Sequence, residues 1–261
     1  MGVLISWANL AEAAATNLTV DSEASGLGLR AVLTPQISDI WRSSTWGATT
    51  INLRADLGSA VAIRTIAIAA PRDGLLPRAD ASIRVTADAS VLDGTGAYDS
   101  GVMSLGTPMS RFGLWGWAGT EISARYVRLS FTGSISDAYL QLGRLWIGPA
   151  LITARNASYG HNAGVVDPGA NARAALTGVR DVQRGTPYRQ LKFPLGFLAE
   201  AEATQVETAA LAAGSTGQVL VARLHTDVAG TGCFGVFSPP PIVTRSAHPF
   251  WSAEMSVEED L

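Results

Sequence analysis

Apolar and polar residues alternate over short segments throughout the first 148 positions of the chain. The clearest segment is 125–131, where two sets of side chains alternate: Val127, Leu129 and Phe131 against Tyr126, Arg128 and Ser130. A period of two places successive side chains on opposite faces of the backbone, so each such segment predicts a half-buried β-strand. The connections 71–77 and 92–101 carry the Gly, Pro and Asp residues typical of tight turns.

One predicted strand changes phase in its middle. Segment 61–70 begins with Val61 and Ile63 on one face and continues with Ile66 and Ile68. This shift predicts a β-bulge near 64–65, where one extra residue reverses the facing of the later side chains. Many short strands with Gly-rich turns, and no long amphipathic helix before residue 149, indicate a β-sandwich or jelly roll.

The pattern changes near residues 147–152, where Gly148 and Pro149 end a strand. Segment 198–214 is rich in Ala and Glu and predicts a helix that ends at Gly214, with strands before and after it. We therefore expect a mainly β protein: an N-terminal jelly-roll β-sandwich over residues 1–148, then a smaller α+β domain with one helix over residues 149–261. Residues 153–188 lack a period and fit either an ordered extended arm or a flexible loop.

The C-terminal segment 250–261 alternates again, with one apolar face: Trp251, Ala253, Met255 and Val257. A long strand left as an exposed edge would invite aggregation, so we expect it to pair inside the second domain, with this face against the helix. Glu258, Glu259 and Asp260 are expected to stay solvated or to meet Arg side chains of a neighbouring molecule.

Composition narrows the classes of function. Apolar residues make up 47% of the chain and charged residues 16%, a balance typical of proteins that bury surface against partners. No apolar run approaches the ~20 residues of a membrane helix, and a net charge of −3 provides no basic field for nucleic acid. The N-terminus lacks the basic region of a signal peptide, and a single cysteine, Cys233, excludes an internal disulfide. We expect neither membrane insertion nor nucleic-acid binding.

Residues able to support catalysis or metal binding are sparse. His161, His225 and His248 have no second ligand at metal-binding spacing, apart from His225 and Asp227 on one face of a predicted strand, where a surface hydrogen bond is the simpler interpretation. Three carboxylates, Asp21, Glu23 and Asp39, would be candidate calcium ligands, but they are too scattered to indicate a site. No nucleophile or phosphate-binding motif is present. We predict no cofactor, no metal and no enzymatic activity.

Four motifs follow one another in the first half: Trp41-Arg-Ser43, Asp56-Leu-Gly58, Ile63-x-x-Ile66-x-Ile68 and Arg125-Tyr-Val-Arg-Leu129. Their order and spacing over about residues 16–148 resemble the discoidin, or coagulation-factor C, domain, a galactose-binding-like jelly roll. The resemblance implies that Trp41 closes the end of the barrel as a core residue. The cysteine pair of many secreted members is missing.

Three further tryptophans have no such structural position. Trp46 lies in a Gly- and Thr-rich segment expected to reach solvent, and Trp115 and Trp117 lie in a predicted Gly-rich loop where both cannot easily be buried. Exposed aromatic side chains serve either as a platform for a sugar ring or as anchors for another protein chain. We favour the protein interface and keep the ligand platform as the alternative.

The second half, about residues 150–261, resembles bacteriophage tail and baseplate components in the order of its elements: a loop-rich stretch, a strand, a Glu-containing helix, and closing strands with an acidic end. Together the halves resemble a phage or gene-transfer-agent tail protein. This implies a virion structural protein near the tail tip, made in the host cytoplasm, which assembles with other tail or baseplate proteins and forms a homo-oligomeric ring. The alternative is a carbohydrate-binding module that recognises a host surface glycan.

Overall fold

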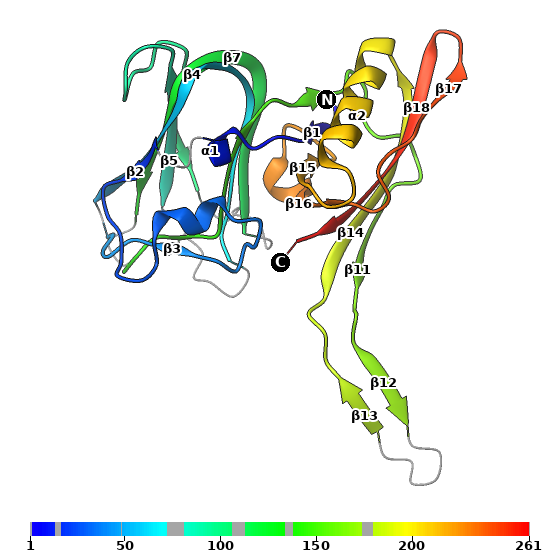
Figure 1. Ribbon diagram of the computed structural model, residues 1–261, viewed down its shortest axis with the longest axis horizontal. Coiled ribbons are helices and arrows are strands. Elements are labelled where there is room, and N and C mark those ends of the chain that lie inside the picture. The colour runs from blue at the N-terminus through cyan, green and yellow to red at the C-terminus, as the bar shows by residue number, and fades with distance from the viewer. Residues whose placement is uncertain are drawn as a thin grey trace.

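The structure is a computed structural model that describes residues 2–13, 17–47, 49–71, 81–105, 113–133, 138–173 and 180–260. Two β-rich units lie side by side, the first on the left and the second on the right of Figure 1. The first unit contains strands β2 to β9, and the second contains β1 and β10 to β18. The protein is therefore mainly β, as the alternating pattern predicts. Among the described residues, no helix is long and apolar enough to cross a membrane.

The first unit is built around two long, bent strands, β4 (Thr50–Ala69) and β7 (Leu114–Thr132). Residues 50–56 of β4 pair with 126–132 of β7, and after two register shifts residues 65–69 pair with 114–118. The ribbon thus bends across the core and contributes to both layers of a jelly-roll sandwich. The second shift lies between Ile63 and Thr65, which confirms the predicted bulge.

One layer of the sandwich has the strand order β2-β4-β7-β5-β6, and in the other layer β9 pairs with the second half of β4. The remaining elements of this unit are β2 (Leu18–Val20), β3 (Trp41–Arg42), β5 (Ser82–Asp88), β6 (Tyr98–Ser104), β8 (Gln141–Leu142), β9 (Arg144–Gly148), α1 (Leu10–Ala13) and the 3-10 helix η2 (Leu29–Leu33).

Apolar residues from both layers fill the core of the first unit, among them Trp41, Ile66 and Phe131. Trp41 is fully buried, as the resemblance implies. Two of the sequence motifs meet on the outside: the Arg125 guanidinium donates to the Asp56 carboxylate at 2.7 Å. This ion pair connects β4, at the bend that follows Asp56, to Arg125 in β7.

The second unit is one curved sheet in the order β10-β1-β15-β16-β18-β14-β11, and β17 also pairs with β18. Its strands are β1 (Leu4–Ser6), β10 (Leu151–Ile152), β11 (Asn162–Val166), β14 (Tyr188–Leu198), β15 (Gln218–Ala222), β16 (Gly232–Phe237), β17 (Val243–Ala247) and β18 (Phe250–Glu259). The short helix α3 (Val228–Thr231) joins β15 to β16.

The helix α2 (Glu200–Ala213) covers one face of this sheet (Figure 1). Val206, Ala209 and Ala213 pack against apolar side chains of the sheet, including Met255 and Val257 of β18. The backbone N–H of Ala199 donates to Glu202 at the first turn, and Gly214 ends the helix with a φ of 57°. Both the predicted helix and the pairing of the C-terminal strand against it are confirmed.

The opposite face of the sheet packs against the first unit. In β15, Val219 and Val221 face α2, whereas Leu220 and Ala222 meet the jelly roll. The jelly-roll strand β4 alternates in the same way, because Ile66 and Ile68 enter its own core while Ala67 and Ala69 face the second unit. Small residues on that face let the two sheets approach closely, and the buried Trp146 fills the remaining space.

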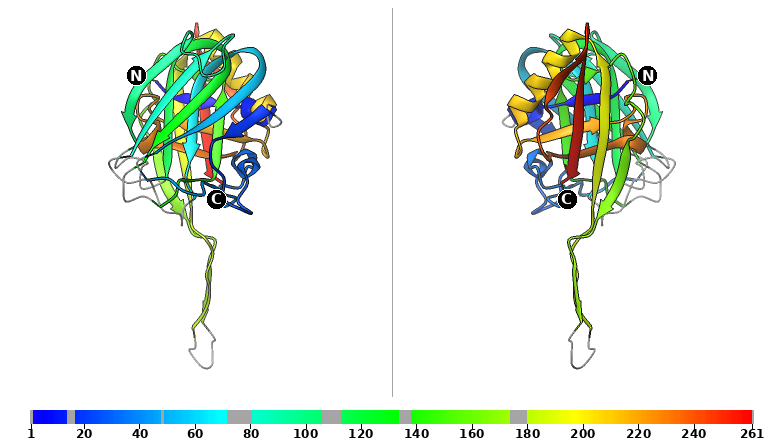
Figure 2. Two further views of the ribbon diagram at one scale, coloured as in Figure 1. Left: turned by 90° about the vertical axis from the view of Figure 1, so that its left-hand side faces the viewer. Right: turned by 90° about the vertical axis from the view of Figure 1, so that its right-hand side faces the viewer.

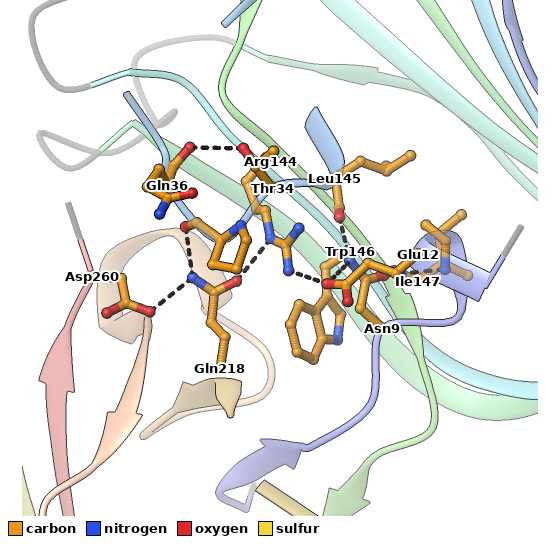
Figure 3. Close-up of polar contacts among 12 residues, drawn as sticks. Asn9, Glu12, Thr34, Gln36, Arg144, Leu145, Trp146, Ile147, Gln218 and Asp260 are labelled. Atoms are coloured by element: carbon orange, nitrogen blue, oxygen red, sulfur yellow. Dashed lines mark hydrogen bonds and ion pairs between the residues drawn. The ribbon is translucent and has the colours of Figure 1, made fainter. Parts of the chain in front are cut away.

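A buried arginine lies where the two units meet (Figure 3). The Arg144 side chain has no exposed surface; it donates to Gln218 Oε1 at 2.7 Å and pairs with the Glu12 carboxylate. Gln218 in turn donates to Pro35 O at 2.9 Å and to Asp260 at 3.0 Å. The pKa of Arg144 lies below its usual value because burial outweighs the hydrogen bond to Glu12. The contacts join the N-terminus, both units and the C-terminus.

Three expectations need correction. The predicted first domain began at residue 1, but β1 lies in the second sheet, because Leu4 and Ile5 pair with both β10 and β15. The predicted strand through His225 ends at Ala222, and Asp227 caps α3 instead. The acidic C-terminus was expected to be solvated or to meet a neighbour, but Glu259 pairs with Arg189 of the same chain. The first and third differences follow from partners distant in sequence, whereas the cap at Asp227 is a local contact with Gly230.

Candidate functional site

A long two-stranded arm projects from the second unit, as both views in Figure 2 show. We define the arm as residues 167–187, which connect β11 to β14. Its described strands are β12 (Ala170–Arg173) and β13 (Arg180–Gln183), which pair only with each other. Of the two interpretations of residues 153–188, the described residues 170–173 and 180–183 favour the extended arm.

Close backbone contact holds the two strands of the arm together at its base. A Cβ atom at Gly185 would lie 2.6 Å from Pro168 Cγ and 2.9 Å from Gly169 N, so only glycine fits there. The Gly169 N–H donates to the Asp167 carboxylate at 2.8 Å, which fixes the turn out of β11. The residues at the base of the arm thus fix the backbone conformation where the arm leaves the sheet.

Apolar side chains on the arm and beside it have no cover. Val165 is 69% exposed, Val182 is 47% exposed, and Tyr159 is fully exposed. A two-stranded ribbon in water has little apolar surface to bury and is marginally stable alone. The arm therefore has the properties of a contact element that gains its stability from a partner.

A groove of about 620 Å³ opens where the arm leaves the sheet. Leu191 and Phe193 of β14 and the edge strand β11 line it, together with Arg189 and Arg223. Because β11 ends the order of the sheet, one side of its backbone has no strand partner among the described residues. An edge of this kind accepts an additional strand.

Ion pairing shapes the electrostatics of the groove. Arg189 Nε donates to Glu259 Oε1 at 2.7 Å, and its Nη1 donates to Gly232 O at 3.0 Å. Arg223 makes a hydrogen bond with His161. Arg223 has no acidic partner among the described residues, so the groove presents one uncompensated cation beside an apolar floor.

The structure places the three tryptophans elsewhere than the sequence suggested. Trp46 is 4% exposed and Trp115 is 7% exposed, and both belong to the core of the first unit. Trp115 and Trp117 lie in β7 rather than in a loop, because the second half of β4 pairs with them. The expectation that Trp46 reaches solvent and that the pair lies in a loop is therefore wrong.

Trp117 is the only one of these three that keeps substantial surface. Its ring packs on Tyr98 with a centroid separation of 4.6 Å, and both side chains are half-buried. Burial is the main reason why the pKa of Tyr98 is raised. A ligand or interface role for Trp46, Trp115 and Trp117 remains a prediction. Of the three, Trp117 has the surface that a ligand or partner could contact.

The candidate metal ligands are occupied by protein donors. Asp21 accepts from Arg54 and Asn52, Glu23 accepts from the Leu29 N–H at 2.8 Å, and Asp39 accepts from the Thr34 hydroxyl at 3.1 Å. His225 meets the backbone of Gly2 rather than Asp227. No group of three potential metal ligands occurs within the described part of the chain.

Sequence reasoning left the arm as one of two alternatives and missed the buried Arg144. The signal for the arm was present in Asp167-Pro-Gly169 and in Gly185, whose close approach requires small residues. Arg144 lies between two apolar stretches, as many exposed arginines do, so its burial could not be recognised from the pattern.

No protein-family model matches this chain. No curated protein matches it either. Among solved structures, the chain is similar to the lectin domain of lectinolysin complexed with Lewis B antigen, with 12% identity and a TM-score of 0.43 over 54% of this chain and 96% of that one.

It is also similar to the family 32 carbohydrate-binding module of C. perfringens NanJ in complex with galactose (12% identity, TM-score 0.42, 55% of this chain and 98% of that one). A third is a fucose-binding module of Streptococcus pneumoniae (11% identity, TM-score 0.40, 54% of this chain and 94% of that one). At these identities the likeness concerns the fold.

Proposed function

We propose that this protein is a non-catalytic structural subunit of a phage-type tail or baseplate. It is made in the host cytoplasm and is incorporated into the virion tail, where it assembles with copies of itself and with neighbouring tail proteins. The observation that carries the proposal is the arm, whose described strands pair only with each other and extend far beyond the body (Figure 2).

The arm is costly to a protein that remains alone. Each residue that is ordered loses conformational entropy of roughly 1–2 kcal/mol, and a ribbon without a core recovers little of it. Contact with another subunit would offset that cost by covering Val165 and Val182, which are exposed in the single chain. An arm of this form therefore supports assembly better than an isolated function.

The position of the arm favours a ring. The arm extends away from the second unit, whereas the groove and the open edge of β11 lie at its base, so the two surfaces differ. Contact between two unlike surfaces of identical subunits is heterologous, and it produces a closed ring when the rotation between subunits closes. The groove of one copy then receives the arm of the next.

Replacing residues 168–185 with an Asn-Gly turn tests the proposal, because this turn closes a two-stranded hairpin. The full chain should form a discrete oligomer in mass photometry, and the shortened chain should remain a folded monomer with a cooperative thermal transition. Leu211→Ala is the matched control, since it removes an apolar side chain that is 87% exposed on α2, away from the arm. Equal association of the full and shortened chains would refute the role of the arm.

A second candidate function is carbohydrate binding by the jelly roll. The stacked pair of Tyr98 and Trp117 favours it, because a half-exposed aromatic surface can pack against the apolar face of a sugar. Trp117→Ala should then abolish binding to a surface glycan. If the protein acts by assembly alone, the same change should leave oligomer formation unaltered.

A further inference from the structure

A second depression, which we call the trough, lies on the face of the sheet opposite α2, with a volume of about 660 Å³. Its floor is formed by residues of β14 and β18 that face away from the helix, among them Lys192, Glu254 and Ser256. The segment Ser238–Ile242 forms one wall. The trough is separate from the groove at the base of the arm, because the two have no lining residue in common.

One polar atom in the trough is buried without a partner. Ser256 is 7% exposed, and its hydroxyl has no hydrogen-bond partner among the described residues. A buried hydroxyl without a partner costs free energy of folding, so such groups are rare and require an explanation. A ligand group that enters the trough would supply the missing hydrogen bond.

Other polar groups of the trough are also without partners. Within the described residues, Lys192 and Glu254 make no ion pair, and the hydroxyls of Ser158 and Ser238 make no hydrogen bond. Lys192 is the only lysine of the chain. The register pairs Lys192 with Ser256 and Pro194 with Glu254, so the cation and the anion occupy neighbouring positions across two strands.

These groups together indicate the chemistry of the ligand. One cation beside one anion gives no net charge, which fits a neutral ligand. Hydroxyls, an ammonium and a carboxylate offer both donors and acceptors, and Pro194, Pro240 and Ile242 add apolar surface. Along the floor, β14 and β18 pair with each other from Gln190–Glu258 to Leu195–Ala253, so their facing backbone groups are already used.

We infer that the trough binds a neutral oligosaccharide. Sugar hydroxyls donate to Glu254, accept from Lys192 and satisfy the hydroxyl of Ser256, while the C–H face of a ring packs on the wall at Ile242, which is 75% exposed. The site lies on the second unit, not on the jelly roll, and it does not depend on the arm.

The test uses the full chain on a printed array of neutral and acidic oligosaccharides, followed by titration with the strongest neutral sugar. Lys192→Gln and Glu254→Gln should each weaken binding about tenfold, since each removes a hydrogen bond with a charged partner. Ser256→Val should weaken it at least as much by filling the floor. Because Lys192 and Glu254 are exposed, these two variants keep the fold even if Ser256→Val does not.

Two controls identify the site. Glu207→Gln, on the exposed surface of α2, should leave the dissociation constant within about twofold. Trp117→Ala should also leave it unchanged, because Trp117 belongs to the first unit. The inference is overturned if no neutral oligosaccharide binds, if only acidic sugars or a proline-rich peptide bind, or if Trp117→Ala abolishes binding while the trough variants do not.

Discussion

The two units differ in the balance of charged and apolar side chains on their exposed surfaces. The first unit pairs its outward charges with each other, as in Arg54 with Asp21 and Asp93, and Arg84 with Asp99. Among the described residues, the second unit leaves six large apolar side chains exposed, whereas the first unit leaves three, Val91, Leu92 and Val102; the six are Tyr159, Val165, Val182, Phe197, Leu211 and Ile242. A sheet with more exposed apolar side chains and an open edge is better suited to partners than a sandwich whose surface charges pair with each other.

Phe197 illustrates the difference further. It is 57% exposed and has a φ of 57°, a conformation that a bulky residue adopts at a cost of about 1–2 kcal/mol. The bulge between Leu195 and Leu198 imposes it, and Arg155 lies over the ring at 5.1 Å. Strain at an exposed aromatic residue is typical of contact surfaces rather than of sheet interiors.

The largest expected effect comes from ending the chain after Ser246, which removes β18. This strand pairs with β14, β16 and β17, so its loss should unfold the second unit while the first unit stays folded. Limited proteolysis should then yield one protected fragment that ends near residue 148. A protected fragment over residues 190–240 would show instead that β18 is peripheral and that the unit holds without it.

A smaller effect is expected at the contact between the units. A Cβ at Gly116 would lie 2.6 Å from Val228 Cγ1, so Gly116→Ala should destabilise the protein by about 1–3 kcal/mol in urea unfolding. Gly164→Ala is the matched control, since the nearest atom to its new Cβ lies 4.0 Å away in an open strand. If both variants unfold at the same urea concentration, the two sheets do not pack as closely as described.

The smallest expected effect is a difference between the two units in the pH at which each one unfolds in acid. Hydrogen bonds from the backbone of Ser90, Val91 and Gly96 lower the pKa of Asp88 to about 2, and the Arg84 guanidinium lowers the pKa of Asp99 to about 2. Both values lie below 3.8, so these groups stabilise the first unit above that pH and lose their contribution as the pH falls toward 2. In the second unit, burial raises the pKa of Asp260. The contribution of Asp260 to stability therefore has the opposite dependence on pH: it is present at low pH and is lost as the pH rises.

Two probes can follow the units during acidification. Tryptophan fluorescence is dominated by the first unit, which holds Trp41, Trp46, Trp115, Trp117 and Trp146. The buried thiol of Cys233 reports opening of the second unit through its accessibility to a labelling reagent. The fluorescence change should come first between about pH 4 and about pH 2, and it should shrink in the Asp88→Asn and Asp99→Asn double variant. Simultaneous responses would argue against separate stabilisation.

Local pattern alone was sufficient for elements with a strong period. Ile66 and Ile68 face the core and a helix ends at Gly214, because each feature depends on residues that are neighbours in the chain. Buried and exposed sides of a strand or helix follow directly from spacing. The resemblance to the discoidin domain, rather than the local pattern, correctly placed Trp41 in the interior.

Only the tertiary structure decided which surfaces are covered. Leu4 and Leu220 lie 216 positions apart in the numbering yet belong to the same interior cluster, and no period in the sequence predicts that contact. Trp115 was expected in a loop but is buried in β7, since the second half of β4 pairs with it. Lys192 and Ser256 meet only through the pairing of β14 and β18. Periodicity specifies the faces of an element, but the partner of each face is selected by the packing of the whole chain.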